Sequence, residues 1–171
     1  MALASVFLGL ACSAEGEWTI DSHVVIEDER LHVDRNITVL DGGTLEILGS
    51  TLVFDCDFPR QYIVRVREGG SLLISRSFGG NVTRILPRDA SSPTHITIDW
   101  AERVHIEHLR MSNCGYFDPD GLNLLYPSLL VRHTDDVVIR RSSFIDCFDP
   151  IELQSCTDIS IEDNVLSLIH I

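Results

Sequence analysis

The sequence predicts an all-β solenoid, in which the chain forms stacked coils of about 22 residues with loop insertions at some corners. Three segments share one pattern of apolar residues at alternate positions: Val104–Met111, Val137–Phe144 and Ile159–Leu166. Equivalent residues are 33 positions apart in the first two segments and 22 apart in the last two. Alternation gives a strand one buried face, and a recurrence near this period is typical of coils stacked ~4.8 Å apart.

Paired glycines provide the second observation. The segments Asp41–Ile47 (DGGTLEI) and Glu68–Ile74 (EGGSLLI) are 27 residues apart and share the order acid, two glycines, hydroxyl, apolar residue. Glycine accepts the positive φ that a tight corner requires. Each pair therefore predicts a corner, after which the next strand begins. The segment Asp55–Arg60 lies between the two corners and is expected to be an outward loop that lengthens this coil.

The first elements along the chain are less regular. The segment Glu17–Leu31 alternates imperfectly and is expected to open the folded part, with Trp18 and Ile20 covering the first coil. An end coil needs such a cover because it otherwise exposes the core and an unpaired strand edge. Farther on, Phe78–Pro93 contains a glycine pair and two prolines, and this composition predicts a longer excursion from the coil.

After this excursion, two strands per coil are expected. The segment Gly115–Pro127 is interpreted as the insertion that stretches one interval from 22 to 33 residues. Insertions at chosen corners are where solenoids carry binding residues. The predicted strands lie at Ile96–Ile98, Val104–Met111, Leu129–Val131, Val137–Phe144, Ile151–Leu153 and Ile159–Leu166.

The apolar side chains at alternate positions are expected to form one continuous core. No stretch of useful length has the helical period. The predicted inward-facing residues are Ile37, Val39, Leu45, Ile47, Val64, Val66, Leu72, Ile74, Ile96, Ile98, Val104, Ile106, Val131, Val137, Ile139, Leu153, Ile159 and Ile161.

Both ends of the chain have unusual compositions. Residues 1–14 are small and apolar, too short a run to span a bilayer, and resemble the end of a secretory signal without its basic start. We interpret them as the remnant of a signal peptide. The last residues, Leu166–Ile171, match the in-frame translation of a transposase-type sequencing adapter. On this interpretation 15–165 is a β-helix domain that is incomplete at its C-terminus, and 166–171 is a non-native tail; the alternative is an ordinary final strand.

The net charge of −13 argues against nucleic acid and anionic membrane surfaces as partners. It predicts a solvated acidic exterior, with cation binding as the alternative. The four cysteines beyond Cys12 form no C-x-x-C pair, so a zinc site is not expected. Cys114 and Cys147 occupy the same repeat position and are expected to stack on neighbouring coils. In-register side chains suit the disulfide dihedral poorly, which favours stacked free thiols over a disulfide bond.

The glycine corners and the I-x-I-x-x-N rungs resemble the right-handed parallel β-helix of pectin-lyase-like proteins, and the later rungs resemble the NosD-type repeat of carbohydrate-binding proteins and sugar hydrolases. The earlier half, with Trp18–Ile20 followed by Asn36–Leu45, is similar to the first coils of exported microbial β-helix proteins. The resemblance covers Glu17–Val165. It implies a secreted or cell-surface protein fragment whose partners are a polysaccharide or cell-surface component and further coils of a longer β-helix. Asn164 matches the rung asparagine of a hydrogen-bond ladder, which Ser142 replaces one coil earlier.

The strongest candidate for ligand binding is a set of loop residues in and after the insertion. Acidic residues beside aromatic rings suit a sugar or a weakly held Ca²⁺, whereas the Asp-Pro-Asp-Gly order is first of all turn chemistry. No resident cofactor and no dedicated metal site is expected. The predicted ligand-binding residues are Tyr116, Asp118, Asp120, Asp146, Phe148 and Asp149.

Other polar residues have plainer interpretations. Asp135, Asp136 and Asp158 precede strands, where aspartate commonly bonds to its own turn; with Arg140 and Arg141 they are the alternative site for a cation or a uronate. The acids are expected mainly at corners, without a basic partner from a second coil.

The remaining candidate residues are three histidines, considered for metal binding, and two asparagines, considered for glycosylation. His105, His108 and His133 are expected to be exposed surface residues, because positions three apart on a strand face opposite sides unless a bend intervenes. Asn36 and Asn81 begin glycosylation sequons.

The function expected from these observations is that of a non-catalytic extracellular or cell-surface scaffold that binds a ligand, with carbohydrate as the candidate ligand. No catalytic residue is assigned. The alternative is part of a polysaccharide lyase or glycoside hydrolase. An enzyme should bring several charged side chains from three adjacent coils together on one exposed face, whereas a scaffold should disperse them.

Overall fold

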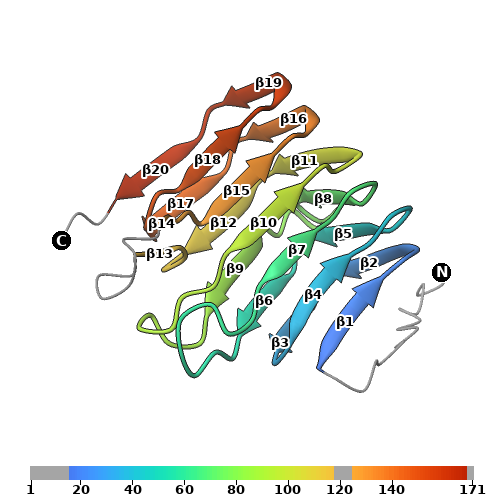
Figure 1. Cartoon of the computed structure of the whole chain (residues 1–171). Helices are drawn as coiled ribbons and strands as arrows, with labels where there is room; N and C mark the ends of the chain where they lie inside the picture. The colour runs from blue at the N-terminus through green and yellow to red at the C-terminus, as the bar shows by residue number, and fades with distance from the viewer. Residues whose placement is uncertain (1–15, 118–124, 169–171) are drawn as a thin grey trace.

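The computed structural model describes residues 16–117 and 125–168, and these form a right-handed parallel β-helix (Figure 1). Each coil supplies one strand to each of three six-stranded parallel sheets, called A, B and C. Sheet A contains β1 (Glu17–Ile20), β4 (Asn36–Val39), β7 (Val64–Val66), β10 (Ile96–Asp99), β15 (Leu129–Arg132) and β18 (Ile151–Gln154). Sheet B contains β2 (His23–Glu27), β5 (Thr44–Leu48), β8 (Ser71–Ser75), β11 (Arg103–Glu107), β16 (Asp135–Arg140) and β19 (Thr157–Glu162).

Sheet C contains β3 (Arg30–Val33), β6 (Thr51–Phe54), β9 (Thr83–Pro87), β12 (Leu109–Ser112), β17 (Ser143–Cys147) and β20 (Val165–Leu168). The short strands β13 (Tyr116–Phe117) and β14 (Leu125–Tyr126) form an antiparallel hairpin between the fourth and fifth coils. Within the described ranges no helix has the length and apolarity to cross a membrane.

The strand register confirms the predicted intervals between coils. Leu45 pairs with Leu72, Ile106 pairs with Ile139, and Ile139 pairs with Ile161. The expectation of two strands per coil was wrong, because each coil has three. The strand β9 was not predicted, because it lies inside the segment that was expected to be an excursion from the coil. Its outward positions carry Arg84 and a half-buried leucine, so its alternation is hard to recognise.

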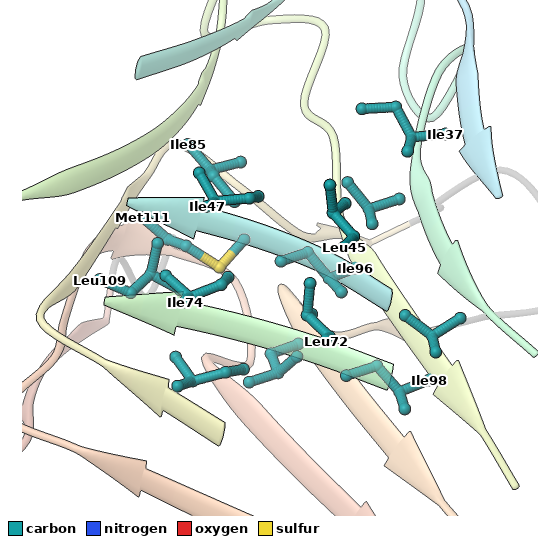
Figure 2. Close-up of a cluster of buried hydrophobic side chains, with 14 of the residues drawn as sticks. Ile37, Leu45, Ile47, Leu72, Ile74, Ile85, Ile96, Ile98, Leu109 and Met111 are labelled. Atoms are coloured by element: carbon teal, nitrogen blue, oxygen red, sulfur yellow. The ribbon is translucent and has the colours of Figure 1, made fainter. Parts of the chain in front are cut away.

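The core runs through the middle of the helix and is lined by all three sheets (Figure 2). Every predicted inward residue from Ile37 to Ile139 is buried. The last coil differs: Leu153 is half-buried, and Ile159 and Ile161 are 42% and 46% exposed. These two residues stand in register with buried residues of β16, but no described coil covers their other side.

The start of the fold also differs from the expectation. The segment with Trp18 and Ile20 does not cover the first coil but forms it, since β1, β2 and β3 each take the end position of one sheet. Ile20 is buried and Trp18 is half-buried. Residues 1–15 and 169–171, which include the interpreted signal remnant and half of the interpreted tail, lie outside the described residues.

The corners explain how the coils stay stacked. Gly42 and Gly69 have φ of 72° and 74°, as the paired-glycine pattern predicts. At Gly43 a Cβ atom would lie 2.2 Å from the backbone oxygen of Ile20, so the close approach of two coils requires glycine there. Other corners use non-glycine residues with positive φ, including His108 at 55°.

Short side-chain ladders tie the corner between sheets B and C. The Leu109 N–H donates to Ser142 Oγ at 3.1 Å, and the Ser142 N–H donates to Asn164 Oδ1 at 2.8 Å. The Asn164 amide in turn donates to the backbone oxygen of Ile139 at 2.8 Å. The three residues therefore form the short rung ladder that the repeat pattern predicts, and it fixes the corner that carries the charged cluster described below.

Candidate functional site

The predicted ligand-binding loop lies at the corner between sheets C and A. Tyr116 is in β13, and Phe148 follows β17 on the next coil. Phe117 of the hairpin stacks on Phe148 with ring centroids 5.9 Å apart, and Phe117 remains 39% exposed. The Phe148 N–H also donates to the backbone oxygen of Cys114 at 2.9 Å. The hairpin thus packs on the equivalent corner of the next coil, where Phe148 lies.

The acidic members of this loop are only partly brought together. Asp118 and Asp120 lie outside the described residues. Asp146 is exposed, and Asp149 is half-buried with φ of 39°. Burial raises the pKa of Asp149, and the nearby charge of Glu152 raises it further. Within 16–117 and 125–168, no group of three or more His, Cys, Asp or Glu side chains is arranged to hold a metal ion.

The same corner contains a buried histidine that the sequence did not single out. His95 is 4% exposed, and its Nδ1 has no hydrogen-bond partner. Burial, with the charges of Arg60 and Arg65, lowers the pKa of His95 to about 4, so the ring is neutral at ordinary pH. The Arg60 guanidinium carbon lies 3.3 Å from the Tyr126 ring centroid, which joins the hairpin to an earlier loop.

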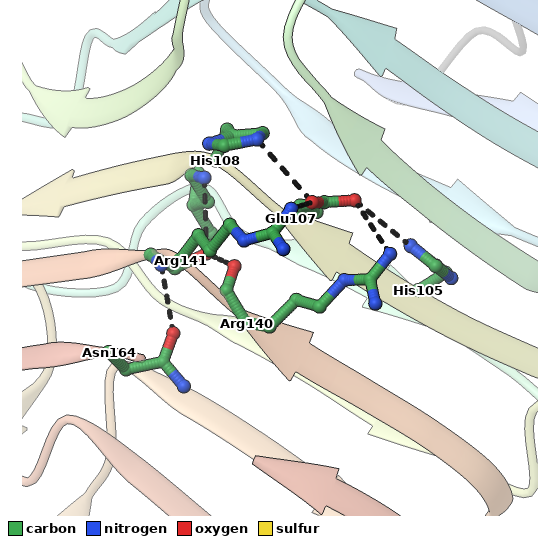
Figure 3. Close-up of polar contacts among 8 residues, drawn as sticks. His105, Glu107, His108, Arg140, Arg141 and Asn164 are labelled. Atoms are coloured by element: carbon green, nitrogen blue, oxygen red, sulfur yellow. Dashed lines mark hydrogen bonds and ion pairs between the residues drawn. The ribbon is translucent and has the colours of Figure 1, made fainter. Parts of the chain in front are cut away.

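The principal charged cluster is centred on Glu107, at the end of β11 (Figure 3). Arg141 Nη1 lies 2.7 Å from Glu107 Oε1, and Arg140 Nη2 lies 3.1 Å from Oε2. His108 Nε2 lies 3.4 Å from Oε1, and His105 Nε2 lies 3.7 Å from Oε2. Arg140 and Arg141 of one coil therefore bind the Glu107 carboxylate of the preceding coil. Each oxygen of this carboxylate also lies near one histidine.

This cluster corrects two expectations. The acids were expected to lack a basic partner from a second coil, yet Glu107 has two. The histidines were expected to be exposed and to face opposite sides, yet the side chains of His105 and His108 are 28% and 20% exposed and both reach Glu107. The positive φ of His108 is the bend that brings them together. A lone glutamate in a strand gives no sequence signal for such a role.

The ionisation of the cluster follows from its contacts. Loss of solvent raises the pKa of Glu107, but the hydrogen bond and charge of Arg140, with the charges of His108 and Arg141, outweigh it, so its pKa lies below the ordinary value. Burial and the charge of Arg76 lower the pKa of His108, against the opposing effect of Glu107. At neutral pH the site thus holds an ionised carboxylate beside a neutral imidazole.

The next coil places acidic residues in register with the arginines. Glu162 is the register partner of Arg140, and its carboxylate accepts a hydrogen bond from Ser160 at 2.8 Å. Asp163, with φ of 54°, occupies the corner beyond it. The carboxylate of Glu162 is thus bonded within its own strand, and the ion pairs of Glu107 join its coil to the next one.

The remaining predicted residues have definite places. Asp136 and Asp158 have φ of 56° and 51°, in agreement with a corner role, and Asp135 accepts a hydrogen bond from the Thr157 hydroxyl. Asn36 Oδ1 accepts the Ile63 N–H at 3.0 Å. Asn81 is exposed, and its amide donates to Asp28 Oδ1 at 2.8 Å. Glycosylation at both sequons stays a prediction.

Cys114 and Cys147 are neighbours, as their shared repeat position predicts. Their strands pair Ser112 with Ile145, two positions before each cysteine. The Cys114 thiol donates to the backbone oxygen of Ser112 at 3.3 Å, and the Cys147 thiol donates to that of Ile145 at 3.5 Å. Both are buried and free. The neighbouring Cys114 thiol lowers the pKa of Cys147 to about 7 against the effect of burial, whereas burial and the neighbouring thiol raise the pKa of Cys114.

Comparison with protein-family models, curated proteins and solved structures finds no match to this chain. The fold is therefore established by the strand topology itself.

Proposed function

We propose that the chain is a non-catalytic β-helix segment of a secreted or cell-surface protein, a rigid scaffold that presents ligand-binding side chains at its corners, with carbohydrate as the ligand class. The observation that carries this proposal is the contact between Phe117 and Phe148. It packs the insertion hairpin on the next coil and leaves Phe117 partly exposed, with Tyr116 beside it. Ordered aromatic rings at a loop suit the apolar C–H face of a sugar and lose little conformational entropy on binding.

The Glu107 cluster supports a structural role better than a catalytic one. A general acid or base works best when its pKa lies near the operating pH. Burial usually raises the pKa of a catalytic carboxyl group toward that pH. The pKa of Glu107 moves the other way because two arginines stabilise its charge. Both carboxylate oxygens are engaged by arginine. The residue therefore acts as a tie between two coils.

The alternative, part of a lyase or hydrolase, has one specific observation in its favour. Charged groups from three successive coils act on one another. The charge of Arg76, on the third coil, lowers the pKa of His108 on the fourth, and Arg140 and Arg141 of the fifth coil bind Glu107 of the fourth. The neutral imidazole of His108 is able to accept a proton. On this alternative, Glu107→Gln abolishes turnover of a glycan; on the scaffold proposal there is no turnover to abolish.

The last described coil offers a second kind of partner. Ile159, Ile161, Val165 and Leu166 are 42–58% exposed, and β18, β19 and β20 each have one unpaired edge in the described structure. A further coil of the same β-helix fits this surface, because it supplies both backbone partners and apolar cover.

The experiment that tests the carbohydrate proposal is affinity electrophoresis of the purified chain through gels containing single polysaccharides. We expect at least one polysaccharide to retard the wild-type chain and Phe148→Ala to weaken the retardation. The matched control is Phe78→Ala, since Phe78 is fully exposed at another corner. Normal mobility of the wild-type chain in neutral and acidic polysaccharides alike would overturn the proposal.

A further inference from the structure

A second aromatic site lies at the corner between sheets A and B, on a different corner from the predicted loop of Tyr116, Asp146, Phe148 and Asp149. Trp100 follows β10 and is 57% exposed. Its ring stacks on the ring of His133 from the next coil, with centroids 4.7 Å apart and an interplanar angle of 10°. The imidazole covers part of one indole face, and more than half of the residue remains open to solvent.

The side chains beneath this ring are held by the carboxylate of Asp99. His133 Nδ1 lies 3.0 Å from Asp99 Oδ1, and Arg132 Nη2 donates to Asp99 Oδ2 at 2.9 Å. Asp99 and Arg132 are register partners, so one carboxylate fixes two side chains of the following coil. The indole therefore rests on a ring that is itself held in place, and it loses little freedom when a ligand stacks on it.

The backbone at Trp100 is fixed on both sides. Its N–H donates to the backbone oxygen of Arg132 at 3.1 Å, and its own oxygen accepts the Gly69 N–H at 3.0 Å. Gly69, on the preceding coil, has no side chain that could cover the indole. Trp100 also has φ of 56°, a conformation that a bulky residue adopts rarely and that aspartate adopts at comparable corners of this chain. Neither burial nor backbone preference explains tryptophan at this position.

We propose that Trp100 is a stacking site for a pyranose ring of an uncharged glycan, an inference that rests on the proposed carbohydrate function and places a second contact on a different corner. The sugar's C–H face packs on the indole. Its hydroxyl groups reach the edge of the platform, where Asp99 has lone pairs and Arg132 has N–H groups beyond those used in their own contact.

The charges around the platform favour an uncharged ligand over an acidic one. Arg132 is already paired with Asp99, and the exposed Arg67 on the preceding coil is followed directly by Glu68. Glu102 lies in the same corner as Trp100, and Asp135 begins β16 on the next coil; both are exposed. With a net charge of −13, the chain as a whole repels polyanions.

The test uses titration calorimetry with neutral oligosaccharides (β-glucan, galactan and mannan hexamers) and with an oligogalacturonate. We expect Trp100→Ala to weaken binding of a neutral hexamer at least 10-fold, Trp100→Phe to keep most of it, and the control Phe78→Ala to leave it unchanged. The chain has two tryptophans, so a Trp18→Phe background assigns the fluorescence to Trp100. In that background a neutral hexamer should shift the emission to shorter wavelength, and far-UV circular dichroism should show that every variant folds.

The outcomes separate the two proposals. If the wild-type chain binds a glycan and Trp100→Ala binds it equally well, the platform is refuted while the carbohydrate proposal stands. Binding of the oligogalacturonate alone refutes the uncharged ligand class. If no glycan of either class binds the wild-type chain, both proposals fail together.

Discussion

Glu107 and Arg141 lie 34 positions apart in the sequence, yet the guanidinium donates to the carboxylate at 2.7 Å across two stacked coils. The contact exists because Glu107 ends β11 and Arg141 directly follows β16, its register neighbour in sheet B. Arg140 approaches the other carboxylate oxygen, so one acid holds two cations of the next coil. The two coils are thus joined by side chains as well as by the backbone ladder.

The stability of this tie is the first prediction. Glu107→Gln should lower the free energy of unfolding by about 1–3 kcal/mol, because the glutamate side chain is 14% exposed and its removal leaves two arginines without their partner. Urea unfolding measures the loss. The matched control is Glu46→Gln, which removes the more exposed pair with His23 and should cost less than ~1 kcal/mol. Equal losses in the two variants would show that Glu107 is an ordinary surface residue.

Glu107 also predicts a pH dependence. Its pKa is lower in the folded chain than its ordinary value, so protonation favours the unfolded chain. The stabilisation from Glu107 is complete above the ordinary pKa of glutamate and disappears as the pH falls through the lowered value. The difference in unfolding free energy between the wild-type chain and Glu107→Gln should therefore be larger at pH 7 than at pH 3. A difference that grows on acidification would contradict this sign.

Two isoleucines that are register partners on neighbouring coils test the core. Ile139 is fully buried, and Ile139→Ala should cost about 2–5 kcal/mol. Ile161, its register partner, is 46% exposed on the last described coil, and Ile161→Ala should cost much less. Urea unfolding of both variants gives the comparison. A similar cost at the two positions would mean that Ile161 is covered in solution.

The close approach of the first two coils gives a further test. Gly43→Ala places a Cβ atom 2.2 Å from the Ile20 oxygen, so the coils have to separate and about 1–3 kcal/mol should be lost. Gly79→Ala is the control, since the nearest atom there lies 3.6 Å away. Thermal unfolding followed by circular dichroism distinguishes them. Equal melting temperatures for Gly43→Ala and the wild-type chain would refute the close contact.

The thiol pair has its own measurement. Cys114 and Cys147 are free in the structure, and we expect both to be reduced in the purified chain. Alkylation under denaturing conditions, followed by peptide mass analysis, should find a label on each. Recovery of a peptide that joins the two residues would instead establish the disulfide bond that the sequence left open.

Much of this fold follows from local patterns, whereas the charged sites do not. The alternating isoleucines and the glycine corners depend on residues close together in sequence, so the intervals and the inward face were predictable. The strand β9 was missed because a strand with arginine outside and proline at its end resembles a loop. Glu107 and Trp100 were missed for a different reason. Their partners come from another coil, and both sites depend on corners with positive φ that no local motif marks.

We propose that the chain binds a glycan without transforming it. Incubation of the purified chain with neutral oligosaccharides and with polygalacturonate, with and without Ca²⁺, allows binding and product formation to be measured in the same samples. We predict retention of at least one glycan and no release of new reducing ends or unsaturated sugars. Turnover that disappears in Glu107→Gln, Asp120→Ala or Asp149→Ala would contradict the scaffold and establish the chain as part of an enzyme.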